Sequence, residues 1–266
     1  MKDTLLSIKK LCVKYKTKKG ILGKTEIVNA VNNLSLDVER GEVYAIAGES
    51  GCGKSTLSKA IIKLEKTDSG QILFDGKDIS RLRNCELRDF RKNVQMIFQN
   101  PYASLNPKMK IFDILKEPLE INTALTPEEI SKKVIDTACK VGIDEDCLNL
   151  YPHEFSGGQR QRVCIARALA LNPDFIVCDE PVSALDVSIQ AQVINLLLDI
   201  QQERGLTYMF VTHDLSVAKF ISTNIMVMYL GEIVELSSAD NVFTNPMHPY
   251  SKALLSAVPS LDIDEQ

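Results

Sequence analysis

Apolar and polar residues alternate along two segments near the start of the chain, residues 5–15 and 27–38. Successive side chains of a β-strand point to opposite faces of a sheet, so this alternation predicts two half-buried antiparallel strands. The apolar run at 71–74 is followed by Asp75 and Gly76, which predicts a third, short strand that ends in a turn.

Compact apolar runs occur farther along the chain, and segments with helical spacing lie between them. The apolar runs predict buried strands at 43–47, 94–98, 175–178, 207–211 and 225–229. The helical patterns predict helices at 56–64, 186–204 and 215–222. Strands that alternate with helices build a mainly parallel sheet with helices on both faces, so the predicted fold class is α/β.

The character of the chain changes to helical between about residues 100 and 170. Helical spacing occurs at 111–119, 127–141 and 158–171, and Pro127 suits the first turn of its helix. The segment 238–258 predicts two short helices around a proline-rich turn. We expect one domain over 1–266, with a core at 1–99 and 170–237 that includes the N-terminal antiparallel β part, an inserted helical part at 100–169, and a C-terminal extension at 238–266.

Composition limits the partners and the cellular compartment that we expect for this chain. Apolar residues make up 45% of the 266 residues, which is ordinary for a chain that buries a core. The net charge of −4 provides no global basic field that would attract nucleic acid. No apolar run approaches the ~18 residues needed to span a bilayer. The seven cysteines form no C-x-x-C pair, so we expect a reducing compartment and no disulfides.

Residues 48–56, GESGCGKST, match the phosphate-binding pattern G-x-x-x-x-G-K-[ST] between a predicted strand and a predicted helix. Glycines let backbone N–H groups approach phosphate oxygens at the positive end of a helix. Lys54 supplies a positive charge to the β- and γ-phosphates, and Ser55 offers a hydroxyl to Mg²⁺. The residues predicted to bind nucleotide in this loop are Gly48, Gly51, Gly53, Lys54, Ser55 and Thr56.

Two adjacent carboxylates, Asp179 and Glu180, end the apolar strand that begins at Phe175. An acid at a strand end beside a phosphate-binding loop can hold the ligand shell of Mg²⁺, which suits Asp179. The next acid, Glu180, can orient and polarise the water that attacks the γ-phosphate. The sequence therefore predicts an enzyme that hydrolyses a nucleotide with the help of Mg²⁺, and these motifs alone leave open which nucleotide it is.

A second candidate anion site lies in FSGGQRQR, residues 155–162, at the start of a predicted helix. Ser156 suits the N-cap position, and Gly157 and Gly158 expose backbone N–H groups at the positive end of the helix dipole. This segment resembles the signature sequence of the ATP-binding-cassette (ABC) ATPases, and it precedes Asp179 by the spacing that this family has. The resemblance implies that Ser156, Gly157, Gly158 and Gln159 contact ATP.

The same resemblance assigns further residues one by one. Gln99 resembles the Q-loop glutamine that senses Mg²⁺ and the transmembrane partner, and Asp186 ends a segment, SALD, that resembles the D-loop. His213 resembles the H-loop histidine that contacts the γ-phosphate, so Lys54, Glu180 and His213 are the implied catalytic residues. Tyr15 lies at a distance before Gly48 that suits the adenine-stacking loop. The implied Mg²⁺ ligands are Ser55, Gln99 and Asp179.

In this family two cassettes form a head-to-tail dimer, and each ATP lies between the phosphate loop of one and the signature helix of the other. The chain has one cassette, so the resemblance implies separate partners: a second ABC ATPase in a heterodimer, two transmembrane permeases and, indirectly, an extracytoplasmic solute-binding protein. The implied location is the cytoplasmic face of the membrane.

Longer matches narrow the subfamily. PHEFSGGQRQR, VCDEPVSALDVSIQAQV, IFQNPYASLNP and NPMHPYSKALLSAVP resemble the ATPase subunits of oligopeptide, dipeptide and nickel importers, most of all the second ATPase of the pair. Import of peptides is the leading hypothesis, and import of nickel or a metal chelate by the same mechanism is the alternative. A soluble ABC ATPase that acts on nucleic acid is a more distant alternative, which the lack of a sustained heptad pattern disfavours.

Overall fold

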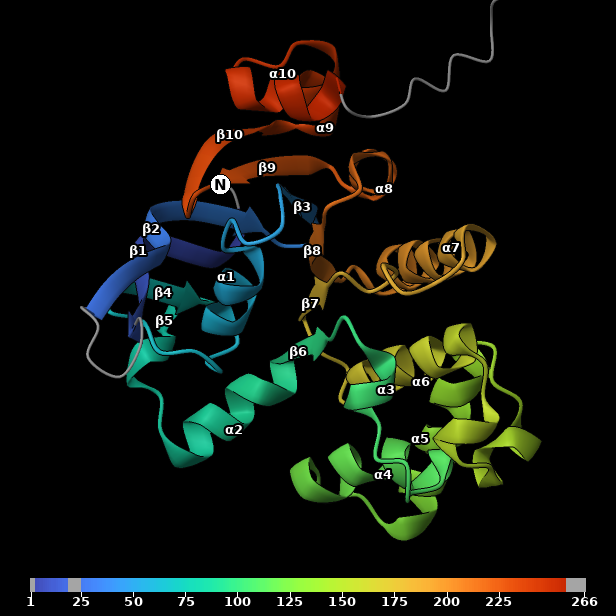
Figure 1. The fold of residues 1–266 in the computed structure, drawn as a ribbon. Coiled ribbons are helices and arrows are strands. Elements are labelled where there is room, and N and C mark those ends of the chain that lie inside the picture. The colour runs from blue at the N-terminus through green and yellow to red at the C-terminus, as the bar shows by residue number, and fades with distance from the viewer. Residues whose placement is uncertain (1–2, 19–24, 257–266) are drawn as a thin grey trace, which may run out of the picture. The chain divides into compact units, whose positions relative to one another are not determined.

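The computed structural model describes residues 3–18 and 25–256, and the chain forms two compact units (Figure 1). The first unit comprises the described parts of Met1–Val38, Glu42–Lys77 and Phe210–Gln266. The second comprises Glu39–Gly41 and Asp78–Met209. The predicted division of one domain into a core, a helical part and a C-terminal extension remains a prediction.

The first unit contains an antiparallel sheet near the N-terminus. Its strand order is β2-β1-β4-β5. The strands are β1 (Thr4–Lys18), β2 (Thr25–Glu39), β4 (Ser69–Phe74) and β5 (Lys77–Asp78). The predicted alternation of apolar and polar positions therefore does build strands, and both long strands extend beyond their predicted ends.

A bulge in β1 explains how apolar residues before and after Lys10 lie on one buried face. Leu6, Ile8, Leu11 and Val13 are all buried, although the parity of the buried positions changes between Ile8 and Leu11. The register with β4 shifts in this interval, where Lys10 has a φ of 48°. One extra residue in a strand resets the alternation, so both apolar pairs remain on the core side.

The first unit also contains β3 (Val43–Ala47), which pairs in parallel with β9 (Asn224–Tyr229). β9 pairs antiparallel with β10 (Glu232–Ser238), a strand that the sequence analysis did not predict. Helices α1 (Lys54–Ile61), α8 (Leu215–Ile221), α9 (Ala239–Thr244) and α10 (Pro249–Ser256) complete this unit. Apolar side chains of β3, β9, α8 and α9 form a common buried cluster.

The second unit is mostly helical. Its strands β6 (Val94–Ile97) and β7 (Phe175–Asp179) are parallel neighbours. Its helices are α2 (Asn84–Asn93), α3 (Pro101–Ser104), α4 (Ile111–Asn122), α5 (Pro127–Lys140), α6 (Gly157–Leu169) and α7 (Val187–Arg204). Short 3₁₀ segments lie at Ile79–Arg81, Glu145–Asn149 and Pro152–Glu154. Strand β8 (Thr207–Thr212) crosses the division between the units along the sequence.

Helix starts in the second unit follow the chemistry of capping. Thr126 and Glu129 form a reciprocal capping box at the start of α5, and Pro127 occupies the first turn as predicted. The N–H groups of Tyr102 and Ala103 donate to the side chain of Asn100 at the start of α3.

Among the residues that the structure describes, no helix is both long and apolar enough to cross a membrane.

Candidate functional site

The predicted phosphate loop connects β3, which is buried along its whole length, to α1. Three of its glycines, Gly48, Gly51 and Gly53, have positive φ angles of 153°, 84° and 110°. A Cβ on Gly48 would collide with the backbone carbonyl oxygen of Met228, and one on Gly53 would collide with that of Ala30. The close approach of these backbones explains why glycine occupies both positions.

Lys54 begins α1, and its side chain is buried with only 4% exposed. Its Nζ donates to the carbonyl oxygens of Gly48 at 2.7 Å and Glu49 at 2.8 Å. It also lies 3.8 Å from the Sγ of Cys52 as a hydrogen-bond donor. The ammonium group is thus held over the loop whose N–H groups are predicted to bind phosphate, at the positive end of the α1 dipole.

Tyr15, the predicted adenine-stacking residue, lies beside α1. Its hydroxyl donates to the carboxylate of Glu65 at 2.9 Å and approaches Oγ1 of Thr56 at 3.5 Å. Burial raises the pKa of Tyr15, the bond to Thr56 opposes this rise, and Glu65 adds to it. The pKa of the phenol is thus raised overall from its ordinary value, which already lies well above neutral pH. The structure thereby connects two residues that were predicted separately, Tyr15 and Thr56.

His213 follows β8 and is exposed. The neighbouring Asp214 caps α8, because its Oδ1 accepts from the N–H groups of Ser216 at 2.8 Å and Val217 at 3.3 Å. Asp214 therefore has a structural role, and His213 presents its imidazole at the end of a buried strand, where the resemblance places a residue that contacts the γ-phosphate.

In the second unit Asp179 and Glu180 occupy the end of β7, as predicted. Asp179 is buried with 6% exposed. Glu180 has a φ of 47°, in the left-handed region that non-glycine residues rarely adopt. Its carbonyl oxygen accepts from the N–H of Ser183 at 3.3 Å and from the Ser183 hydroxyl at 3.1 Å. This tight turn fixes the backbone from which the Glu180 carboxylate projects.

Gln99 lies next to Glu180, and the register of the two parallel strands explains why. Ile97 of β6 pairs with Cys178 of β7, so the residues that follow both strands lie at the same edge. The Nε2 of Gln99 donates to Oε2 of Glu180 at 2.9 Å. The structure thus brings together a predicted Mg²⁺ ligand and the predicted catalytic carboxylate.

The predicted signature residues form the start of α6. Ser156 is the N-cap: its Oγ accepts from the N–H of Gln159 at 3.3 Å, and its own N–H donates to Oε1 of Gln159 at 2.9 Å. A Cβ on Gly158 would lie 2.5 Å from Cγ2 of Ile189. A Cβ on Gly157 would lie 3.5 Å from Cδ2 of Leu185, an ordinary contact. Glycine at 158 therefore has a packing reason as well as a predicted binding role.

Asp186 occupies the N-cap position of α7, although its side chain makes no capping hydrogen bond. Its backbone carbonyl accepts from the N–H groups of Ile189 at 2.9 Å and Gln190 at 2.8 Å. The predicted D-loop is thus the entry to α7, which packs against the signature helix through the Gly158–Ile189 approach.

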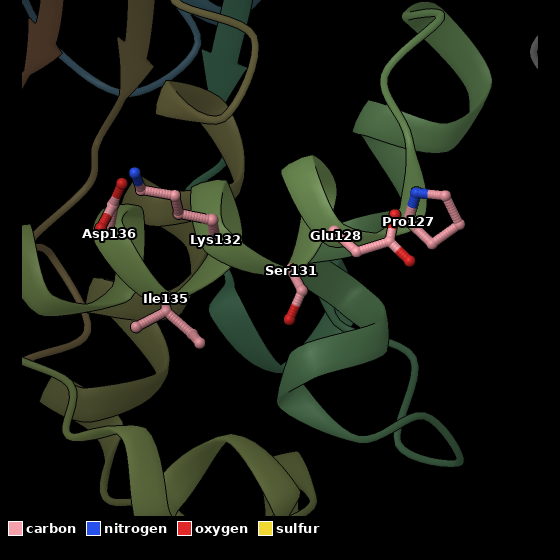
Figure 2. Close-up of a pocket in the computed structure, with 6 residues that line it drawn as sticks. All are labelled: Pro127, Glu128, Ser131, Lys132, Ile135 and Asp136. Atoms are coloured by element: carbon pink, nitrogen blue, oxygen red, sulfur yellow. The ribbon is translucent and has the colours of Figure 1, made fainter.

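A separate surface hollow lies along α5 (Figure 2). Its lining residues are Pro127, Glu128, Ser131, Lys132, Ile135 and Asp136. None of the predicted nucleotide-site residues belongs to this lining.

Sequence reasoning missed contacts to the phosphate loop from distant segments, and one of them comes from Tyr250. The hydroxyl oxygen of Tyr250 accepts a hydrogen bond from the backbone N–H of Glu49 at 3.1 Å. Because these residues are far apart in sequence and belong to no common motif, no spacing rule could have linked them.

Comparison with known proteins identifies the family. The sequence pattern described as "ABC transporter" matches residues 31–183, more than half of the chain. The chain belongs to the ABC transporter family. The predicted family and fold are therefore confirmed, and this ABC protein is an ATPase that binds ATP, as the sequence analysis predicted. A second pattern, "Oligopeptide/dipeptide transporter, C-terminal region", matches residues 234–266.

Two curated relatives show how far the similarity of this ABC ATPase extends. The oligopeptide transport ATP-binding protein OppF of Bacillus subtilis (strain 168) is 50% identical over 99% of this chain and 85% of the relative. The dipeptide transport ATP-binding protein DppF of Escherichia coli (strain K12) is 48% identical over 95% of this chain and 75% of the relative.

Solved structures of ABC proteins have the same fold. The ATP-binding cassette MJ0796, in a dimeric post-hydrolysis state bound to ADP and Pi, matches with a TM-score of 0.77 and 32% identity, over 88% of this chain and 98% of that one. CbiO1 from Clostridium perfringens, part of the ABC transporter complex cbiONQ, matches with a TM-score of 0.78 and 30% identity, over 91% and 92% of the two chains.

Proposed function

We propose that this ABC ATPase energises the import of oligopeptides or dipeptides through separate membrane permeases. The match of residues 234–266 to the C-terminal region of oligopeptide/dipeptide transporters carries this conclusion. The names of the relatives agree with it, since they are oligopeptide and dipeptide transport ATP-binding proteins. The predicted peptide-importer ATPase is thereby confirmed at the level of its class, and neither nickel import nor action on nucleic acid is favoured.

The phosphate loop binds ATP through its backbone N–H groups and Lys54. The Nζ of Lys54 exchanges its bonds to the loop carbonyls for bonds to the β- and γ-phosphate oxygens, whose negative charge attracts it more strongly. Gly48, Gly51 and Gly53 permit the close backbone approach, and Tyr15 provides an aromatic face for the adenine ring.

Mg²⁺ fits the donor set that the sequence analysis assigned to it. A hydroxyl from Ser55, an amide oxygen from Gln99 and a carboxylate from Asp179 are the oxygen ligands that Mg²⁺ prefers. When bound, Mg²⁺ neutralises phosphate charge. The burial of Asp179 at the end of β7 restricts the positions of its carboxylate.

Glu180 polarises the water that attacks the γ-phosphate. Gln99 orients its carboxylate through the 2.9 Å bond, and the turn closed by Ser183 fixes its backbone. His213 stabilises the charge of the γ-phosphate from the end of β8. Each of these roles holds or moves a proton or a charge at a defined atom, which is how phosphoryl-transfer enzymes lower the barrier.

The signature residues Ser156, Gly157, Gly158 and Gln159 bind the ATP held by a partner cassette, and Asp186 lies at the interface with that cassette. The capped N-terminus of α6 presents N–H groups and a positive dipole end to phosphate. The partner is a second ABC ATPase in a heterodimer at the cytoplasmic face of the membrane. Two permeases form the pore, and an extracytoplasmic solute-binding protein delivers the peptide.

Reconstitution with the permeases and the partner ATPase tests this function. ATP hydrolysis by the assembled transporter should rise several-fold when its solute-binding protein carries a short peptide, and should stay at the basal rate with nickel. Stimulation by nickel alone would replace peptide by metal as the solute. A rate that responds to neither, in an assembly that hydrolyses ATP, would contradict the importer assignment.

A further inference from the structure

The C-terminal helix α10 contacts the phosphate loop within the first unit. The hydroxyl oxygen of Tyr250 accepts from the backbone N–H of Glu49 at 3.1 Å. Its ring packs on the ring of Tyr229 at the end of β9, with centroids 4.4 Å apart and an interplanar angle of 42°. The ring contact and the hydrogen bond together fix the Tyr250 side chain at the start of the loop.

The bonded N–H belongs to a peptide group that Lys54 also binds. The carbonyl of Gly48 and the N–H of Glu49 are parts of one planar peptide unit, and they point in opposite directions. Tyr250 accepts from the N–H, while Nζ of Lys54 donates to the carbonyl oxygen at 2.7 Å. A rotation of this peptide unit would weaken both bonds at once, and each bond polarises the group so that the other becomes stronger.

The carbonyl group of Glu49 is a second acceptor for the side chain of Lys54. The carbonyl oxygen of Glu49 accepts from Nζ of Lys54 at 2.8 Å and from the N–H of Cys52 at 3.3 Å. The orientation of the Gly48–Glu49 segment therefore fixes both carbonyl partners that hold the Lys54 ammonium beside the predicted phosphate site.

A carboxylate on β10 places Tyr250 within reach of the loop. Glu235 accepts from the N–H groups of Met247 at 2.9 Å and His248 at 3.1 Å. The N–H of Tyr250 in turn donates to Nδ1 of His248 at 3.2 Å. Burial raises the pKa of Glu235, but Ser251 and these two N–H groups stabilise its charge more, so the pKa is lowered overall. The turn before α10 is thus fastened to the sheet by a charged acceptor.

We propose that Tyr250 is a positioning residue for the phosphate loop, through which the C-terminal peptide-transporter region sets the affinity of the ATPase for ATP. The segment from Glu235 to Tyr250 holds the first peptide unit of the loop in the orientation that keeps Lys54 in place. The effect on ATP rests on the phosphate-binding role proposed for this loop, whereas the hydrogen bond itself does not.

The test compares Tyr250→Phe with Tyr229→Phe in the full chain. Both variants keep the contact between the two rings, but only Tyr250→Phe removes the acceptor of the Glu49 N–H. Amide hydrogen exchange of residues 48–56 should become about three- to ten-fold faster in Tyr250→Phe, as expected for one lost hydrogen bond, and should stay unchanged in Tyr229→Phe. In the assembled transporter, the KM for ATP should rise by a similar factor in Tyr250→Phe, with kcat within two-fold of the unsubstituted protein.

Each other result overturns the proposal. Unchanged exchange in Tyr250→Phe would mean that the bond does not hold the loop. Faster exchange with an unchanged KM would mean that the loop is held but ATP affinity is not set there. A lower thermal midpoint with kcat and KM both altered would make Tyr250 a general structural residue. Amide exchange is measured without ATP turnover. It therefore tests the hydrogen bond between Glu49 and Tyr250 even if the proposed transport function is wrong.

Discussion

The side-chain amide of Gln99 donates to the carboxylate of Glu180 over 2.9 Å, from the end of one parallel strand to the end of its neighbour. Replacing Gln99 by Ala should lower kcat for ATP hydrolysis about ten-fold, because the carboxylate loses the donor that orients it, and should change the ATP dissociation constant much less. Steady-state hydrolysis and equilibrium binding of a fluorescent ATP analogue measure the two effects.

Gln95 offers a matched control for this substitution. It lies on the same strand, β6, but its amide donates to the backbone carbonyl of Arg91 and not to Glu180. Gln95→Ala should leave kcat within two-fold of the unsubstituted protein. If Gln99→Ala hydrolyses ATP at the full rate, Glu180 does not depend on Gln99 for its orientation.

Lys54→Ala should lower ATP hydrolysis about 10²-fold or more, because the loop loses the charge that pairs with the β- and γ-phosphates. Lys59, in the last turn of the same helix and exposed, provides the control. Lys59→Ala should bind and hydrolyse ATP normally. Equal losses in the two variants would indicate that helix α1, and not the position of Lys54, is responsible.

The two signature glycines should differ in their tolerance of a methyl group. Gly158→Ala places a Cβ 2.5 Å from Cγ2 of Ile189 and should lower the free energy of unfolding by about 1–3 kcal/mol. Gly157→Ala meets only Leu185 at 3.5 Å and should not destabilise the protein. Urea denaturation measures both. Adding Ile189→Ala should recover part of the Gly158→Ala loss, and no recovery would refute the steric explanation.

Buried thiols should make stability depend on pH above neutrality. Burial raises the pKa of Cys164 to about 11, and Arg167 lowers it only in part. The thiol is therefore protonated in the folded protein while its unfolded counterpart ionises near pH 9, so its contribution is complete below about pH 9 and is lost as pH rises towards 11.

Urea unfolding at pH 8 and pH 10 tests this dependence with two alanine variants. Cys164→Ala should lose less stability between the two pH values than the unsubstituted protein does. Cys85→Ala, which changes an exposed thiol, should lose as much as the unsubstituted protein. An equal loss of stability between pH 8 and pH 10 in all three proteins would contradict a buried, neutral thiol at Cys164.

The sequence predicted most strands and helices because their burial patterns are simple. β3 has the bounds that its apolar run predicts, and α5 begins at the proline that was assigned to its first turn. Helix α2 (Asn84–Asn93) was missed because it buries only Phe90, which leaves no apolar periodicity to detect. β10 was missed for a similar reason, since none of its residues is fully buried.

The candidate site also contains features that the sequence predicts and contacts that it does not predict. Loop chemistry is local, so the glycines, Lys54 and the strand-end acids follow from motif spacing. The contacts of Gln99 with Glu180 and of Tyr250 with Glu49 join distant segments through strand register and the turn before α10, which no local pattern encodes. All seven cysteines are free in the structure, and the reducing compartment remains a prediction.

Paired uptake in cells tests whether ATP hydrolysis at Glu180 powers the import of peptides. Cells that carry either the unsubstituted protein or Glu180→Gln receive a labelled short peptide and radiolabelled nickel, with parallel peptide importers deleted. Glu180→Gln should abolish peptide uptake, leave nickel uptake unchanged and retain ATP binding. Unchanged peptide uptake in the Glu180→Gln cells would contradict the claim that ATP hydrolysis at Glu180 powers peptide import.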